Sequence, residues 1–412
     1  MIFPGEKIQW EKEKQTTVHA SDSKINEKYM AGEVRIVTEQ ARYPLDTITG
    51  MVSSGKYNLM PTFQRRHRWD DEKKSRLIES FIMNVPIPPI FLYEVKFSEY
   101  EVMDGLQRLS TICDFYEDKF CLTGLKLWPE LNGKRYSELP EMVRQGIDRR
   151  YLSSIILLQE SAKTAQKAQD MKQLVFERIN SGGVKLEPQE TRNALYNGPM
   201  NELCANLARN KYLCALFRIP NEESYSLLDD EQELPDVAER VEKELENNSL
   251  YRTMYDVELV LRFFAIRNLE GYQNQFSDFL DKYLIYANKF SSETLKKLSS
   301  LFSDTIFFAY QLLGENAFFL WRYRRTKSGS KWGWFTRSTT TVYDPLMFVL
   351  SEFLDQKECL LSAVKAIRED LKPFYQKNYD VFEGRNSNRS DIEKRITLYR
   401  EYTYNGLPTR HC

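Results

Sequence analysis

The fold of the first half of this chain is decided by the stretch YEVMDGLQRLSTICDFY, residues 100–116. It begins as an alternating apolar run, as in a half-buried strand, and the alternation ends at Asp104-Gly105. The apolar residues that follow have the spacing of one helix face: Leu109, Ile112, Cys113 and Tyr116. A strand is therefore predicted to pass directly into a helix, through a turn that contains an acid, a glycine, an amide and an arginine.

The predicted turn carries groups that can hold an anion. Gln107 and Arg108 fall in the first helical turn, where backbone N–H groups lack partners within the helix and the helix dipole favours negative charge. Gly105 lets a bound group approach the backbone, and Asp104 is placed to hold a divalent metal ion or a water molecule on the anion. The alternative is structural: Asp104 caps the helix and pairs with Arg108, four residues later.

Short apolar runs and helical patterns alternate around this turn, from about residue 43 to 160. The predicted strands are residues 57–61, 88–95, 100–105 and 151–160. The predicted helices are residues 106–120 and residues 70–84, which Asp70 or Asp71 can cap. From about residue 165 the patterns are helical, except for a basic, aromatic hairpin near residues 320–342. The sequence therefore predicts an α+β domain followed by a mostly α-helical half.

We expect three parts along the chain: an N-terminal arm over residues 1–40, an α+β domain over residues 41–200 and a helical domain over residues 201–412. The arm is predicted because its residues are polar and show no sustained periodicity. No run approaches the ~18 apolar residues of a membrane span, and the N-terminus has no apolar signal-peptide core. A cytoplasmic protein that does not bind membranes is therefore expected.

The composition limits which sites are possible. The 412 residues include 58 basic and 59 acidic side chains, a formal net charge of −1, so a nucleic-acid surface has to be a local patch. Only three histidines occur, His19, His67 and His411, and no two of the six cysteines have the C-x-x-C spacing. These counts argue against a multi-histidine metal centre and against a zinc site.

Two other segments contain groups that can belong to a ligand site. In PTFQRRHRW, residues 61–69, Gln64 and Arg65 are the candidates to point inward. FERINSGGVKLEPQETRNAL, residues 176–195, joins two predicted helices through a loop that begins at Asn180 and exposes backbone amides. The structural alternatives are a solvated basic turn for the first segment, and a helix end followed by a new helix start for the second.

Together with SFIMNVPIPPIFL, residues 80–92, these motifs occur in the order of a known family. Over roughly residues 40–200 the chain resembles the N-terminal domain of GmrSD-type restriction enzymes, which is named for a DGQQR motif. That domain is similar to the ParB/sulfiredoxin fold. The resemblance implies a ParB-like nucleotide-binding domain in a prokaryotic restriction or anti-phage defence system that acts on DNA or senses it.

The resemblance also implies roles for individual residues. Asp104, Gln107 and Arg108 match the catalytic turn of a nucleoside triphosphate hydrolase that uses Mg²⁺ with GTP or ATP, and Asp104 is the metal-binding residue. The matching nucleotide-binding positions are Gln64, Arg65, Gly105 and Asn180. Leu106 departs from the pattern, because it stands where the family has a glutamine and its side chain cannot form a hydrogen bond.

A second departure concerns the C-terminal half. Many relatives carry an HNH nuclease domain there, and its chemistry needs a histidine general base beside metal ligands. After His67 this chain has only His411. We therefore expect a member without an HNH domain, in which nucleic-acid cleavage comes from a nuclease or other defence-system partner, or from the N-terminal domain.

The predicted hairpin is the candidate for a DNA contact. The segment Trp321–Arg337 contains six basic residues and no acid, with aromatic residues between them. Basic groups follow phosphates, and aromatic rings stack on bases. The candidate DNA-binding residues are Arg322, Arg324, Arg325, Lys327, Lys331, Trp332 and Trp334. The alternative is a hairpin whose rings pack on the helices while the basic side chains remain in water.

Three hypotheses about function result from these observations. In the first, the chain is an NTP-binding and NTP-hydrolysing component of a defence or restriction system, and its helical half couples the nucleotide to DNA or a partner protein. In the second, it is a non-catalytic nucleotide- or DNA-binding module that works with a partner effector. In the third, it is a ParB-like metal-dependent nuclease in which Asp104 and nearby acids bind the metal. The first two differ in whether catalysis needs the amide that Leu106 lacks.

Overall fold

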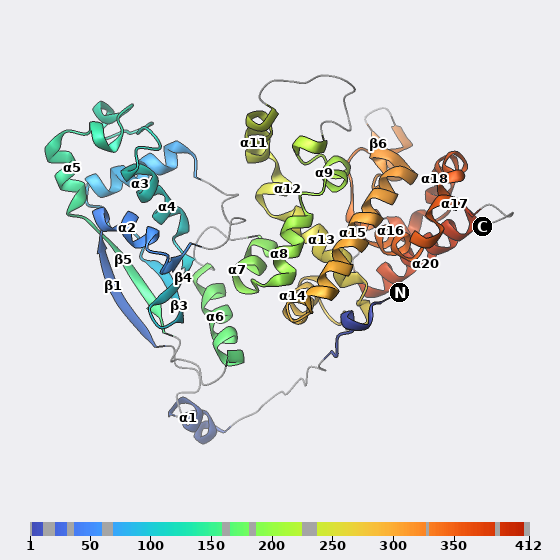
Figure 1. Cartoon of the computed structure of the whole chain (residues 1–412), viewed down its shortest axis with the longest axis horizontal. Coiled ribbons are helices and arrows are strands. Elements are labelled where there is room, and N and C mark those ends of the chain that lie inside the picture. Colours follow the sequence, from blue (N-terminus) through green and yellow to red (C-terminus); the bar gives the residue numbers. More distant parts are fainter. Residues whose placement is uncertain are drawn as a thin grey trace. The chain divides into compact units, whose positions relative to one another are not determined.

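The chain folds into two compact units (Figure 1). A computed structural model describes residues 2–10, 21–30, 37–59, 69–158, 165–180, 187–224, 237–326, 329–383 and 388–407. One unit, here called the sheet unit, lies within residues 13–186. The other, the helical unit, combines residues 1–12 with residues 187–412. The five-stranded sheet of the first half and the helices of the second confirm the predicted α+β fold class.

The sheet unit contains a mixed sheet with the strand order β1-β5-β3-β4-β2. Its strands are β1 (Thr38–Pro44), β2 (Tyr57–Asn58), β3 (Ile90–Lys96), β4 (Glu99–Asp104) and β5 (Tyr151–Leu157). β3 and β4 form an antiparallel pair, in which Leu92 lies opposite Val102. The outer pairs are β1 with β5, which is antiparallel, and β2 with β4, which is parallel. β4 therefore lies between β3 and the short edge strand β2, which pairs with Tyr100 and Glu101, whereas Asp104 at the carboxyl end of β4 lies opposite Phe91 of β3.

One face of the sheet forms the core of this unit. The helices of the unit are α1 (Asp22–Met30), α2 (Ile48–Ser53), α3 (Asp71–Ile82), α4 (Leu106–Tyr116), α5 (Glu141–Asp148) and α6 (Ala165–Asn180). Ile90, Leu92 and Val102 on the sheet pack with Ile78 of α3 and Ile112 of α4 in one apolar cluster. The periodic apolar residues of both helices therefore point inward, as their spacing predicted.

The opposite face of β3 and β4 is covered by α6 (Figure 1). Lys172 of α6 donates a hydrogen bond from Nζ to Glu101 Oε2 of β4 at 2.6 Å, and both residues are buried. The same ammonium group lies 5.5 Å from the ring centroid of Tyr93 on β3. Burial raises the pKa of Tyr93, and the Glu101 carboxylate adds to this effect. This buried ion pair fixes α6 on the strand that ends at Asp104.

The strands that surround the turn were predicted, but the edge strand β1 was not. Its residues, TEQARYP, are mostly exposed or half-buried. A strand at the edge of a sheet is not enclosed by neighbours on both sides, so its sequence need not show the apolar alternation of a buried strand. Pairing with β5, from Thr38 opposite Leu157 to Pro44 opposite Tyr151, decides its conformation.

The helical unit is built around α13 (Tyr255–Ile266), in which residues 256–266 are all buried. The other helices of this unit are α7 (Pro188–Leu195), α8 (Pro199–Leu207), α9 (Lys211–Phe217), α11 (Val237–Asn247), α12 (Ser249–Arg252), α14 (Phe276–Ala287), α15 (Ser292–Leu313), α16 (Thr340–Glu352), α17 (Lys357–Ser362), α18 (Val364–Lys377), α19 (Tyr379–Phe382) and α20 (Arg389–Asn405). An antiparallel hairpin of β6 (Leu320–Thr326) and β7 (Gly329–Phe335) lies within the segment singled out at 320–342. None of the described helices has the length and apolar character needed to cross a membrane.

The N-terminal residues differ from the predicted arm of residues 1–40. Residues 2–10 belong to the helical unit, and Glu6 is fully buried there. Arg267 donates hydrogen bonds from Nε and Nη2 to the two Glu6 carboxylate oxygens, both at 2.8 Å. The ring of Trp10 packs on Phe279 and Tyr286. Sequence periodicity does not reveal this packing, because Glu6 and Arg267 are 261 positions apart.

The second segment of the helical unit begins at Glu187, whereas the sequence placed a domain boundary at residue 200. The helix α7 therefore belongs to the helical unit. Its Arg192 is fully buried and donates from Nη1 to Glu258 Oε2 of α13 at 2.9 Å. It also donates from Nε to Asp281 Oδ1 of α14 at 2.6 Å. Because both ends of the sheet unit continue into the helical unit, the sheet unit is an insertion within the helical one.

Candidate functional site

The turn between β4 and α4 is fixed by Gly105. This residue is the N-cap of α4 and has a φ angle of 98°, in the left-handed region. A Cβ atom built at this position would lie 2.3 Å from Ile90 Cγ2. Both the backbone angle and the close contact exclude a larger side chain. Glycine is therefore required by the local structure itself, in addition to any role in admitting a ligand to the backbone.

Asp104 and Arg108 form an ion pair across this turn. Arg108 donates from Nη2 to Asp104 Oδ2 at 2.6 Å and from Nη1 to the carbonyl oxygen of Pro88 at 2.8 Å. The Arg108 side chain is 12% exposed and the Asp104 side chain is 39% exposed. The i, i+4 pairing considered as the structural alternative is therefore present, although the cap is Gly105 and not Asp104. The carboxylate remains accessible at the end of the strand.

Gln107 connects the turn to the beginning of α3. Its Oε1 atom accepts a hydrogen bond from the backbone N–H of Trp69 at 3.1 Å. Trp69 directly precedes Asp70, whose side chain caps α3 by accepting a hydrogen bond from the N–H of Lys73 at 2.8 Å. The predicted cap of this helix is thereby confirmed. Gln107 thus holds the last residue of the PTFQRRHRW segment against the turn.

Leu106, the residue that departs from the family motif, points into the protein. Its half-buried side chain packs against the apolar cluster that contains Leu109 and Ile112. A leucine at this position contributes to packing. Because Leu106 packs against the apolar cluster, the leucine that stands in place of the family's glutamine affects packing on the side of the turn that faces the core.

Three of the predicted nucleotide-binding residues cannot be placed. Gln64 and Arg65 lie outside the described residues. Asn180 is the last residue of α6, but its side chain is not described. The described part of the site therefore consists of the turn itself, Trp69 and the Pro88 carbonyl. The roles of Trp69, Pro88 and the Lys172–Glu101 pair were not predicted from the sequence, because they depend on contacts between distant segments.

The turn supplies one carboxylate that can contribute to a metal site. Within the described residues, no group of three or more His, Cys, Asp or Glu side chains is placed to hold a metal ion. Mg²⁺ commonly uses one or two protein carboxylates and completes its octahedral shell with water and substrate phosphates. Asp104 fits an ion of this kind, which arrives with a nucleotide. The described residues do not form a metal site made of protein ligands alone.

The described candidate DNA-binding residues lie on both faces of the β6–β7 hairpin. The ring of Trp332 contacts Tyr379 of α19 with centroids 5.4 Å apart, and Trp334 contacts Tyr375 of α18 at 6.3 Å. These contacts are those of the packed hairpin considered as the alternative. Lys327 lies outside the described residues, and the side chain of Arg325 is not described. The described cations of the hairpin strands are therefore Arg322, Arg324 and Lys331.

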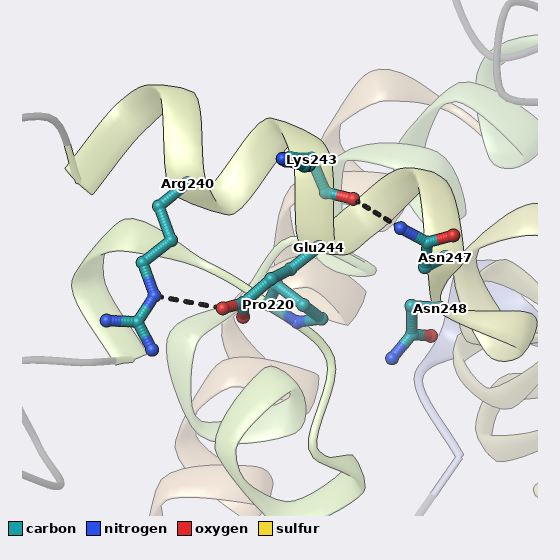
Figure 2. Close-up of a pocket in the computed structure, with 6 residues that line it drawn as sticks. All are labelled: Pro220, Arg240, Lys243, Glu244, Asn247 and Asn248. Carbon is teal, nitrogen blue, oxygen red and sulfur yellow. Dashed lines mark hydrogen bonds and ion pairs between the residues drawn. The ribbon is translucent and has the colours of Figure 1, made fainter.

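An open pocket of about 530 Å³ lies elsewhere in the helical unit (Figure 2). It is lined by Pro220, Arg240, Lys243, Glu244, Asn247 and Asn248. Arg240 Nε donates to Glu244 Oε1 at 2.9 Å, so these two charges compensate each other. None of the residues singled out from the sequence lines this pocket.

Comparison with protein families identifies the segment that carries the turn. Residues 48–197 match the family model of the GmrSD restriction endonuclease, N-terminal domain. These residues form a GmrSD N-terminal domain. Comparisons with curated proteins and with solved structures give no match. The GmrSD family indicates a role in restriction or anti-phage defence.

The GmrSD domain extends beyond the sheet unit. Its matched residues continue through α7, which belongs to the helical unit. In the ETRNAL part of the motif, Arg192 and Asn193 are buried and bonded within the helical unit. These two residues therefore contribute to the packing of α7. The GmrSD segment ends in a helix that is held by buried charges in the second unit.

Proposed function

We propose that this protein is a cytoplasmic NTP-binding and NTP-hydrolysing component of a restriction or anti-phage defence system. The β4–α4 turn binds the triphosphate of GTP or ATP with Mg²⁺. The helical unit couples nucleotide binding and hydrolysis to DNA or to a nuclease or other effector protein. The GmrSD match over residues 48–197 supports the defence role. The nucleotide role is our inference from the turn.

The observation that carries the proposal is the combination of groups at one strand end. Gly105 has no side chain to cap the first-turn N–H groups of α4, an 11-residue helix. The half-exposed Asp104 carboxylate and the Arg108 guanidinium lie at the same position. An uncapped helix start favours an anion, and an arginine can hold phosphate oxygens through two parallel hydrogen bonds.

The proposed roles follow from what each group can donate or accept. Arg108 and the first-turn N–H groups hold phosphate oxygens, and Asp104 accepts a hydrogen bond from the water that attacks the terminal phosphate. Mg²⁺, held by Asp104 and the phosphates, would neutralise charge on the triphosphate. Gln107 keeps Trp69 against the turn through the hydrogen bond from the Trp69 N–H. For Arg108 to bind phosphate, its contact with Asp104 has to be shared or exchanged.

The first prediction concerns nucleotide affinity. Arg108→Ala is expected to weaken binding of a purine triphosphate by about ten- to hundredfold, because it removes a charge-assisted hydrogen bond of about 1.5–3 kcal/mol. Isothermal titration calorimetry with Mg²⁺ measures this loss. Arg150→Ala is the matched control, because Arg150 also donates to a backbone carbonyl of the sheet unit, that of Phe81 at 3.1 Å. Equal affinity in wild type and Arg108→Ala, with both proteins folded, would contradict the site.

The second prediction concerns hydrolysis. Asp104→Asn keeps the shape of the side chain but removes its charge, and we expect phosphate release to fall by about ten- to hundredfold through the loss of a charged hydrogen bond. Phosphate release is measured at saturating nucleotide, so that weaker binding does not mimic the effect. A variant as active as the wild type would remove Asp104 from the reaction.

The second candidate function is a nucleotide- or DNA-binding module without catalysis. It is favoured by the Asp104–Arg108 pair, since a carboxylate engaged by an arginine is less available to metal or water. This alternative predicts nucleotide binding that depends on Arg108, with no phosphate release by the wild type in the presence or absence of DNA. The two experiments above therefore distinguish the two functions.

A further inference from the structure

The two faces of the β6–β7 hairpin have different chemical characters. On one face, Trp321 contacts Trp334 and Tyr323 contacts Trp332, with ring centroids 5.3 and 5.7 Å apart. Lys372 of α18 lies 5.0 Å from the ring of Trp321. The tryptophan rings on this face therefore contact other rings or α18 and α19, which leaves them poorly placed to receive stacked bases, whereas Tyr323 is 47% exposed.

The other face carries positive charge. The guanidinium groups of Arg322, Arg324 and Arg337 surround the ring of Phe335, at 4.1, 5.7 and 4.8 Å from its centroid. Lys331 is exposed and lies directly opposite Arg324 in the strand register. We call Arg322, Arg324, Lys331 and Arg337 the arginine face. Arg324 is held in place by a hydrogen bond from Nη1 to the carbonyl oxygen of Trp334 at 2.9 Å.

The four cations of the arginine face form no ion pair with a carboxylate in the described part of the chain. The ion pairs found among the described residues include none of these four side chains. The Nε atom of Arg322 is buried and has no hydrogen-bond partner among the described residues. Gly333, which lies opposite Arg322, leaves open space where a side chain would stand. Cations held close together repel each other, and this repulsion is relieved when an anion binds.

We propose that the arginine face binds the phosphate backbone of duplex DNA without reading its sequence. This specifies the DNA contact in the proposed function. Duplex DNA is favoured because it presents regularly spaced phosphates, and binding to them requires only positioned cations. A single-strand site would use exposed aromatic platforms, and the tryptophans of this hairpin are engaged on its other face.

The test compares salt dependence of DNA binding between two triple variants with the same net charge. Replacing Arg324, Arg337 and Lys331 by glutamine removes up to three phosphate contacts. The slope of log K against log salt for a short duplex is then expected to flatten by up to about 2.7, at about 0.9 for each contact. The control replaces three exposed lysines of the same unit by glutamine: Lys289, Lys296 and Lys297. Its salt slope is expected to remain that of the wild type.

Two single variants distinguish the contributions of the two hairpin faces to DNA binding, and they keep the inference testable if the triple variant does not fold. Lys331→Gln, at an exposed position, is expected to flatten the slope by up to about 0.9. Lys372→Gln removes a cation from the tryptophan face and should leave the slope unchanged. All titrations are done by fluorescence anisotropy without nucleotide, so a failure of the nucleotide site leaves their outcome unaffected. Melting curves verify that each variant is folded.

Several outcomes would overturn the inference. One is a wild-type slope in both the arginine-face triple variant and Lys331→Gln. Another is equal flattening in the lysine control, which would indicate an effect of net charge alone. The inference also fails if the wild type binds single strands more tightly than duplex and Trp332→Leu removes that binding, or if it binds phosphatidylserine vesicles but no duplex.

Discussion

Replacing Arg192 by methionine is expected to lower the free energy of unfolding by about 3–5 kcal/mol, the usual cost of removing one partner from a buried ion pair. The Arg192 side chain is 2% exposed and links three helices. It pairs with Glu258 at 2.9 Å and with Asp281 at 2.6 Å, and donates to Ser277 Oγ at 2.7 Å. Methionine has a similar length, so the main effect is the loss of charge and hydrogen bonds.

The expected loss lies toward the lower end of this range, because Glu258 keeps a second cation. Arg262 Nη1 donates to Glu258 Oε1 at 3.3 Å, and Arg262 also pairs with the buried Asp344. Asp281, in contrast, loses the ion pair that Arg192 makes with it. Chemical denaturation of the full chain, followed by circular dichroism, measures the change.

The control for this experiment is Lys297→Gln. Lys297 and Glu293 form an exposed i, i+4 pair at 2.7 Å in α15 of the same unit. Exposed helix pairs contribute about 0.3–0.5 kcal/mol, so the control is expected to remain within this amount of the wild type. If Arg192→Met were no less stable than Lys297→Gln, the charge network would not stabilise the attachment of α7.

The second large effect is expected for Gly105→Ala, which should lower the free energy of unfolding by about 2–5 kcal/mol. Two costs add up at this position. An L-residue in the left-handed region costs about 1–2 kcal/mol, and overpacking of a core costs about 1–3 kcal/mol. The second cost arises because the new Cβ would meet Ile90 Cγ2 at 2.3 Å and Ile90 Cβ at 2.9 Å.

Gly133→Ala separates the two costs. Gly133 also has a positive φ angle, 84°, but no atom lies within 4 Å of the position that its Cβ would occupy. This control should therefore lose only the backbone cost of about 1–2 kcal/mol. Similar losses in the two variants would mean that Ile90 can move away, and that the close contact at Gly105 does not constrain the turn.

The same experiment bears on the site, because the new side chain would also approach Arg108. A Cβ atom at residue 105 would lie 3.2 Å from Arg108 Nη2, the atom that donates to Asp104. Gly105→Ala is therefore expected to reduce nucleotide affinity as well, whereas Gly133→Ala should leave it unchanged. Calorimetry under conditions in which both variants remain folded distinguishes this effect from a general loss of stability.

The sequence by itself determined the local features around the turn. The end of β4, the start of α4 and the inward face of α3 follow from spacing and capping residues only a few positions apart. Asp70 caps α3 as predicted, because the hydrogen-bond partner of a cap lies three residues later in the chain. The motif order around Asp104 also sufficed to indicate the GmrSD family.

Only the tertiary structure decided which of two possible roles a motif residue has. Leu106 faces the apolar core, whereas Trp332 contacts Tyr379 of α19 and Trp334 contacts Tyr375 of α18, both in helices later in the chain. Arg192 finds Glu258 at a separation of 66 positions, and Arg267 finds Glu6 at 261. Periodicity reports which side of an element is buried, but the identity of the partner depends on how distant elements pack. For this reason the sequence did not show that the charge of Arg192 holds α7 in place, although Arg192 is part of a motif that the sequence singled out.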